Sequence, residues 1–273
     1  MYVLRPERKT FEYFNGYEMS LKDTLGGIIG QLNTENLKEI ENGVNEVDQL
    51  LRSLASSIQK SHTSGSMDSR LASFVSLQDN FQYNLSSALL SAYRDILQAS
   101  DSPRIETILK INTCLMGLLL VHPESRNIFG KKANMSVILG FLDPDNEWYS
   151  LEICASFVSL LIHILLFNLR NMRVFEACGG CSTIIHLLQY SPAESKELDT
   201  QAALQQNLHF KVVEFLIFYM TDEKEFGDSG GVPMRSVAEK ASFIKPDFPA
   251  IEDLIDTLND LSTTKTTISR VHG

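Results

Sequence analysis

The chain has 273 residues, a hydrophobic content of 44% and a formal net charge of −10, with a sequence pI of about 5.1. This length and hydrophobicity allow a sizeable core in one large domain or two small ones. The acidic balance argues against nucleic acid as a partner, because neutralising phosphates requires a basic face. Four cysteines are too few for a disulfide scaffold and no charged-then-apolar leader opens the chain, so we expect a cytoplasmic protein with reduced thiols.

Helical periodicity runs through almost the whole chain, and strand signals are nearly absent. Apolar residues three or four apart predict a helix over 37–58, and the Ser/Gly-rich stretch 60–69 predicts a loop. The helical spacing resumes over 71–96, where we expect two helices with an indistinct junction. Pro103 stops that run because proline cannot sit in a helix interior, and a new helix is expected over 104–121.

Two later segments repeat one another. Residues 114–142 align on residues 160–188 at a constant offset of 46 without a gap, and apolar residues meet apolar residues, as Phe129 meets Phe175. Each segment reads as a long apolar helix, a short helix, a small-residue turn and an amphipathic helix, which is the layout of armadillo and HEAT repeats. We therefore predict an all-α fold, an armadillo/HEAT-like right-handed helical solenoid.

One apolar stretch raises the question of a membrane. Residues 151–169 are about as long as a bilayer-spanning helix, but they contain Glu152 and His163. Similar apolar helices are expected over 108–121 and 208–220, at equivalent places in the repeat. A repeat protein buries such helices between neighbouring units, so we expect a core helix and no membrane insertion.

The end elements of the repeat are atypical. A longer loop is expected over 191–205, and an amphipathic helix over 248–261 is expected to close the core, as terminal units of a solenoid must. We predict a single armadillo-like helical domain over 31–262. Residues 1–30 form an N-terminal segment of unknown role, and residues 263–273 form a frayed polar tail.

The pair Cys178 and Cys181 is the first candidate for chemistry. A thioredoxin-like dithiol needs an exposed cysteine at a helix N-terminus that follows a strand, and no strand is evident here. A structural zinc site needs four ligands, whereas Cys114 and Cys154 stand singly in apolar helices. A redox or zinc-binding protein built on Cys178 and Cys181 therefore stays only as an alternative.

Other motifs are weaker. The stretch "GDSGGVP" (227–233) copies the nucleophile loop of trypsin-like proteases, but the β-barrel and the histidine motif that such a loop needs are missing from the sequence. The stretch "LGGIIG" (25–30) lacks the Lys-Ser/Thr of a phosphate-binding loop. We expect no catalytic residue, no metal and no cofactor. Gly179 and Gly180 are expected to form a structural turn, because glycine tolerates the left-handed conformation that ends a helix.

The segment "VFEACGGCSTIIHLLQY" (174–190) resembles the armadillo consensus, in which an acidic residue, a small residue and Gly-Gly precede a Leu-rich third helix. More specifically, the chain resembles the fungal cell division control protein family of the septation initiation network, which is unrelated to the like-named phosphatase. The stretches that carry the resemblance, together with this segment, are collinear: 40–54, 74–90, 117–142, 210–220 and the terminal helix.

The resemblance implies a non-catalytic subunit that binds a germinal-centre-class serine/threonine kinase at spindle pole bodies, in the pathway that triggers septum formation. In armadillo-type units the third helix lines the concave face, so its outward positions are the candidate partner contacts. These are Ser136, Asp143, Ser182, His186 and Gln189, with Lys211 on the following helix. A further alternative is a homo-oligomeric structural scaffold in which the basic N-terminus docks onto the acidic C-terminal helix of a neighbour.

Overall fold

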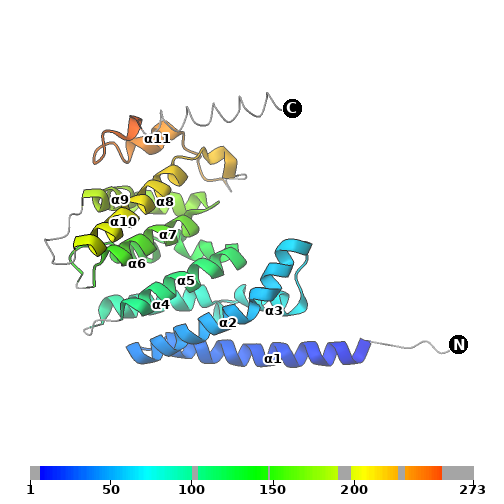
Figure 1. The fold of residues 1–273 in the computed structure, drawn as a ribbon. Helices are drawn as coiled ribbons and strands as arrows, with labels where there is room; N and C mark the ends of the chain where they lie inside the picture. Colours follow the sequence, from blue (N-terminus) through cyan, green and yellow to red (C-terminus); the bar gives the residue numbers. More distant parts are fainter. Residues whose placement is uncertain (1–6, 100–103, 147, 190–197, 227–230, 254–273) are drawn as a thin grey trace. The chain divides into compact units, whose positions relative to one another are not determined.

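The computed structural model describes residues 7–99, 104–146, 148–189, 198–226 and 231–253, and all regular secondary structure in these residues is helical (Figure 1). The predicted all-α class is therefore confirmed. The chain divides into two compact units, residues 1–128 (unit 1) and residues 129–273 (unit 2). The right-handed solenoid and the domain limits 31–262 stay predictions.

Unit 1 begins with a pair of long helices. Its elements are α1 (Glu7–Leu32), α2 (Leu37–Ser64), α3 (Ser69–Gln78), the short 3-10 helix η1 (Phe81–Tyr83), α4 (Leu85–Gln98) and α5 (Ile105–Val121). Helix α2 starts where the Asn36 side chain accepts a hydrogen bond from the Lys38 amide. It ends at Gly65, whose φ of 68° is left-handed. The loop predicted over 60–69 is thus limited to 65–68, because only Gly65 breaks the helix and the serines before it do not.

The core of unit 1 reaches into the N-terminal segment. Leu21, Leu25, Ile28 and Leu32 form one buried stripe on the second half of α1, which packs against α2 and α4. The corresponding stripe of α2 is buried as the spacing predicted, at residues such as Ile40 and Val44. The last part of the segment 1–30 therefore contributes to the helical core, and the predicted tail 263–273 lies outside the described residues.

Unit 2 contains the second copy of the repeat. Its elements are α6 (Lys132–Gly140), α7 (Leu151–Leu165), α8 (Leu169–Ala177), α9 (Gly180–Gln189), α10 (Leu198–Tyr219), the 3-10 helix η3 (Glu223–Phe226) and α11 (Val237–Ser242). The order long helix, short helix, third helix in α7, α8 and α9 is the predicted layout. The same order appears 46 residues earlier in α5, the 3-10 helix η2 (Pro123–Gly130) and α6. The predicted helix layout of both repeat copies is confirmed.

Helix α7 is the central helix of unit 2. Most of its side chains are buried, and the Phe157 ring stacks on Phe141 with centroids 4.5 Å apart. Helix α10 packs along α7 and also contacts α9 (Figure 1). Helix α10 begins at Leu198, so the prediction of a loop over 191–205 is wrong for residues 198–205. The Ala, Leu and Gln residues there favour helix. Among the described residues no single helix is long and apolar enough to cross a membrane; α5 and η2 meet that test only together, as a bent pair.

Candidate partner-binding surface

The joint between α8 and α9 is formed by the two glycines that the sequence singled out. Gly179 has a φ of +77°, the left-handed conformation that favours glycine. At Gly180 an added Cβ would stand 2.2 Å from the ring of the buried Phe175, so the backbone there lies directly on an aromatic side chain. Together they let α9 begin immediately after α8 and against it.

The cysteines at this joint lie in different surroundings. All four cysteines of the chain are free thiols. Burial raises the pKa of Cys181, and likewise of Cys114 and Cys154, to about 12. Cys178 is half-buried, with its Sγ 4.0 Å from the Lys132 carbonyl oxygen. Since redox exchange requires a thiolate, the burial of Cys181 favours a packing role for this pair.

The six residues predicted to contact a partner differ in their exposure. Ser136, Asp143, His186 and Gln189 are exposed, whereas Ser182 and Lys211 are half-buried.

Three of the six have contacts of their own in unit 2. Ser136 Oγ lies 4.0 Å from the Sγ of Cys178, and His186 Nε2 lies 3.9 Å from Asp247 Oδ1. Lys211 Nζ donates to Glu214 Oε2 over 2.8 Å. The described contacts do not join the six to one another, so their common role as a partner surface stays a prediction.

An apolar stripe on α10 was missed by the sequence reasoning. Phe210, Val213 and Ile217 are 65%, 41% and 46% exposed, and their spacing of three and four places them on one face of the helix. The opposite side of α10, with Val212, Phe215 and others, is buried. Because residues 208–220 are apolar nearly all round, the sequence predicted a buried helix with only Lys211 as a candidate partner contact. Exposed apolar groups at helical spacing are typical of an interaction surface.

A second exposed aromatic group lies where α7 joins α8. Phe167 is largely exposed and has a φ of +54°, a left-handed conformation that costs a non-glycine residue about 1–2 kcal/mol. Its ring meets Phe226 edge-on at 5.6 Å, and Phe226 stacks on Phe218 of α10 at 6.2 Å. These three rings form an aromatic group at the C-terminal end of α10.

Unit 2 also contains a cluster of buried charges. Arg173 of α8 donates to Glu176 Oε1 over 2.6 Å and also to Glu223 of η3. Tyr219 of α10 donates to Glu176 over 2.9 Å, and an Arg235 guanidinium nitrogen lies 3.2 Å from Glu176 Oε2. The side chain of Glu176 is 1% exposed, so these contacts replace its hydration. We call these five residues the ion cluster; it ties α8, α10 and η3 to the segment before α11.

Helix α11 is held beside the ion cluster by Lys240. This buried lysine donates to the Thr221 carbonyl and lies 5.6 Å from the centroid of the Tyr219 ring. Its burial lowers its pKa. The acidic position of the armadillo-like segment was visible in the sequence as Glu176, but its partners Tyr219 and Arg235 lie 43 and 59 residues further on, beyond the reach of local patterns.

Unit 1 contains a different polar cluster that unites a serine, a histidine and an aspartate. His122 Nδ1 lies 2.8 Å from Ser125 Oγ, and its Nε2 lies 2.9 Å from Asp79 Oδ1. The combination is that of a hydrolase triad, but Ser125 is 3% exposed and its Oγ already accepts a hydrogen bond from Asn84 over 2.9 Å. A substrate carbonyl therefore has no approach to Ser125, and the cluster fastens the end of α3 to the turn after α5.

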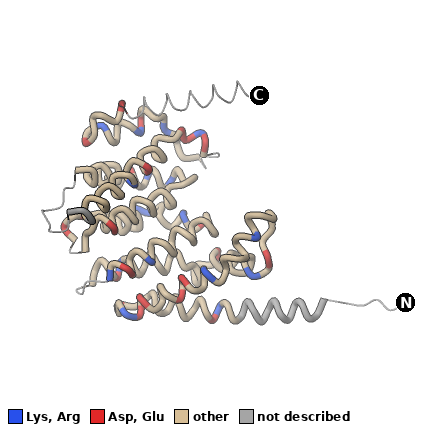
Figure 2. Tube along the Cα trace, viewed as in Figure 1, with Lys and Arg blue, Asp and Glu red and all other residues tan. Residues whose placement is uncertain are grey.

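Acidic and basic residues both occur along the helices of unit 1, for example along α2 (Figure 2). Such interleaving does not make the single-sign basic face that nucleic acid requires. In unit 2 the candidates for partner binding are the exposed apolar stripe of α10 and Phe167.

Comparison with known protein families matches residues 21–232 to the family described as "Cell division control protein 14, SIN component". The match covers well over half of the chain. The chain belongs to this family. Its match begins at Leu21, a buried residue of the α1 stripe, and ends before Arg235 and α11. Four of the five residues of the ion cluster lie within it.

A relative in Schizosaccharomyces pombe agrees with this family. It is named Cell division control protein 14 and is 23% identical over 214 residues, which cover 74% of this chain and 80% of the relative. No solved structure matches the chain. The resemblance to the septation initiation network family, rather than to the like-named phosphatase, is confirmed.

Proposed function

We propose that this protein is a non-catalytic adaptor subunit that binds a germinal-centre-class serine/threonine kinase and activates or positions it during septation initiation. The family membership supports a role in the septation pathway. The kinase partner rests on the resemblance that the sequence carries, and with it we propose a location in the cytoplasm and at the spindle pole body. The protein acts by binding, without chemistry of its own.

The exposed apolar stripe of α10 is the observation that carries the proposal. Phe210, Val213 and Ile217 present three apolar side chains on one helix face, which is how a helix contributes the dry centre of an interface. Lys211 and Glu214 flank the stripe as an ion pair and supply a polar rim. Helix α9 contacts α10, and we propose that its exposed His186 and Gln189 belong to the same binding surface.

An adaptor of this kind acts through differential affinity. It shifts the kinase towards activity only by as much as it binds the active conformation more tightly than the inactive one. A tenfold preference corresponds to about 1.4 kcal/mol. An adaptor with equal affinity for both conformations localises the kinase without activating it.

The proposal is tested by measuring kinase binding and kinase activity on the same samples. The full-length protein is titrated into the purified kinase, and phosphorylation of a peptide substrate is followed. We expect binding, with activity rising along the binding curve. Charge reversal of the predicted rim, in the double variant His186→Glu/Gln189→Glu, is expected to weaken binding because these side chains are exposed beside α10. Absence of binding by the wild-type protein contradicts the proposal. Unchanged affinity of the double variant would show that His186 and Gln189 of α9 do not contact the kinase.

A further inference from the structure

The chain that follows α10 is anchored on unit 2 as far as its last described residues. Lys240 of α11 donates to the carbonyl of Thr221, just after α10. Asp247 Oδ1 lies 3.9 Å from Nε2 of His186 on α9, the helix that contacts α10. Ile251 is fully buried and begins the helical turn with which the described chain ends. The C-terminal segment therefore leaves unit 2 from a packed anchor.

The residues that follow this anchor carry an apolar stripe in their sequence. Leu254, Leu258 and Leu261 recur at spacings of four and three, and Ile251 precedes them by three. This spacing places all four on one face of the helix predicted over 248–261, most of which lies outside the described residues. Most residues between them are acidic or polar. An amphipathic helix of this kind needs an apolar surface against which its stripe can pack.

The exposed stripe of α10 is an apolar surface of matching size. Phe210, Val213 and Ile217 recur at spacings of three and four, the reverse of the order found in residues 254–261. Each stripe spans seven residues, which is about 10 Å of helix at 1.5 Å per residue. Two helices packed antiparallel would therefore bring the three apolar residues of one stripe opposite the three of the other.

The length of chain after the anchor allows the two stripes to meet. Ten residues, 252–261, reach about 35 Å when extended. Packed helices lie about 8–10 Å apart between their axes, and Asp247 already contacts α9 next to α10. A segment on so short a tether is present at a millimolar effective concentration, so even a weak contact is populated.

We propose that residues 254–261 dock on the exposed stripe of α10 and compete with the kinase for it. The inference rests on the proposed function, because the stripe is the surface proposed to bind the kinase. Ile251 stays packed while the leucines beyond it exchange between the stripe and solvent. The kinase then binds only those molecules whose stripe is uncovered, which lowers its apparent affinity by that fraction.

Methyl NMR spectra of the full-length protein test the contact. In Leu258→Gln/Leu261→Gln the segment loses two apolar side chains, so we expect the methyl signals of Val213 and Ile217 to shift. Unchanged signals overturn the inference. Equally strong shifts at the buried Ile164 of α7 also overturn it, because they would show that the segment belongs to the core of unit 2.

The matched control for this variant is Thr257→Gln/Asn259→Gln. It changes two residues of the same segment that lie off the predicted apolar face. We expect the methyl signals of the α10 stripe to stay as they are in wild type. Shifts as large as those of the leucine variant overturn the inference, because they would arise from any substitution in the segment.

Kinase titration with the same variants separates this inference from the proposed function. With the stripe covered in about half of the molecules, the leucine variant is expected to bind the kinase about twofold more tightly than wild type. The control variant should bind as wild type does. Methyl shifts without a gain in affinity overturn the competition. Failure of wild type and both variants to bind the kinase contradicts the proposed function, and the methyl signals then still decide whether the segment covers the stripe.

Discussion

The two sides of α10 differ in what they contact, although both are apolar. On one side Val212, Phe215 and Tyr219 are buried, and the Tyr219 hydroxyl joins the ion cluster. On the other side Phe210 and Ile217 are exposed. One helix thus contributes to the core of unit 2 and leaves an apolar side exposed, which is the proposed partner surface. Substitutions on the two sides are expected to separate stability from binding.

The largest expected effect comes from the ion cluster. Arg173→Met leaves the buried carboxylates of Glu176 and Glu223 without the guanidinium that pairs with both. Removing one partner of a buried ion pair costs about 3–5 kcal/mol, and we expect a loss of that size in the free energy of unfolding. Urea denaturation followed by circular dichroism measures it, with Arg52→Met as an exposed control. A loss no larger than that of the control would show that the cluster does not stabilise unit 2.

The glycine joint is expected to give an intermediate effect. In Gly180→Ala the new Cβ would meet the buried Phe175 ring at 2.2 Å, so the ring or the start of α9 must shift. Overpacking of this kind costs about 1–3 kcal/mol. In Gly179→Ala the new Cβ meets no neighbouring atom, and only the left-handed φ is unfavourable. We expect this conformation to lower the free energy of unfolding by about 1–2 kcal/mol. Denaturation midpoints should therefore fall further for Gly180→Ala, and the reverse order would contradict the close approach at residue 180.

The smallest effect on stability is expected on the exposed side of α10. Phe210→Gln and Ile217→Gln remove apolar groups that solvent already reaches, so the free energy of unfolding should stay within about 0.5 kcal/mol of wild type. The same denaturation experiment checks this expectation. A loss of 2 kcal/mol or more would show that the stripe is part of the core and not a free surface.

The sequence predicted those parts of the molecule that depend on local patterns. Helical spacing predicted the order of α7, α8 and α9, and the 46-residue repeat predicted the same order in the preceding segment. The paired glycines marked the joint at residue 179 because left-handed conformation is a local property of the backbone. The segment chosen as armadillo-like also contained Glu176, the centre of the ion cluster.

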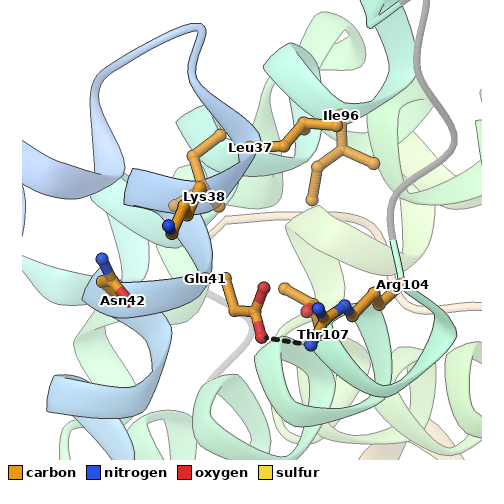
Figure 3. Close-up of a pocket in the computed structure, with 8 residues that line it drawn as sticks. Leu37, Lys38, Glu41, Asn42, Ile96, Arg104 and Thr107 are labelled. Carbon is orange, nitrogen blue, oxygen red and sulfur yellow. Dashed lines mark hydrogen bonds and ion pairs between the residues drawn. The ribbon is translucent and has the colours of Figure 1, made fainter.

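Other parts could not be predicted from the sequence because they depend on packing between distant segments. In the second half of α10 apolar residues occur on every side of the helix, so only its contacts with α7 and α9 decide that Phe210 is exposed. Two partners of Glu176, Tyr219 and Arg235, are more than 40 residues away in the chain. In unit 1 the contact of Arg104 with Glu41 (Figure 3) likewise joins the starts of α5 and α2, and the two residues are 63 positions apart in the chain.

The central claim, that the exposed side of α10 binds the kinase, is tested most directly by titrating the purified kinase with Phe210→Gln/Ile217→Gln. Phe81→Gln is the matched control, because Phe81 is an almost fully exposed phenylalanine in unit 1. We expect the double variant to bind at least about tenfold more weakly than wild type, a loss of about 1.4 kcal/mol, and the control to bind as wild type does. Equal affinities of wild type and the double variant would contradict the account.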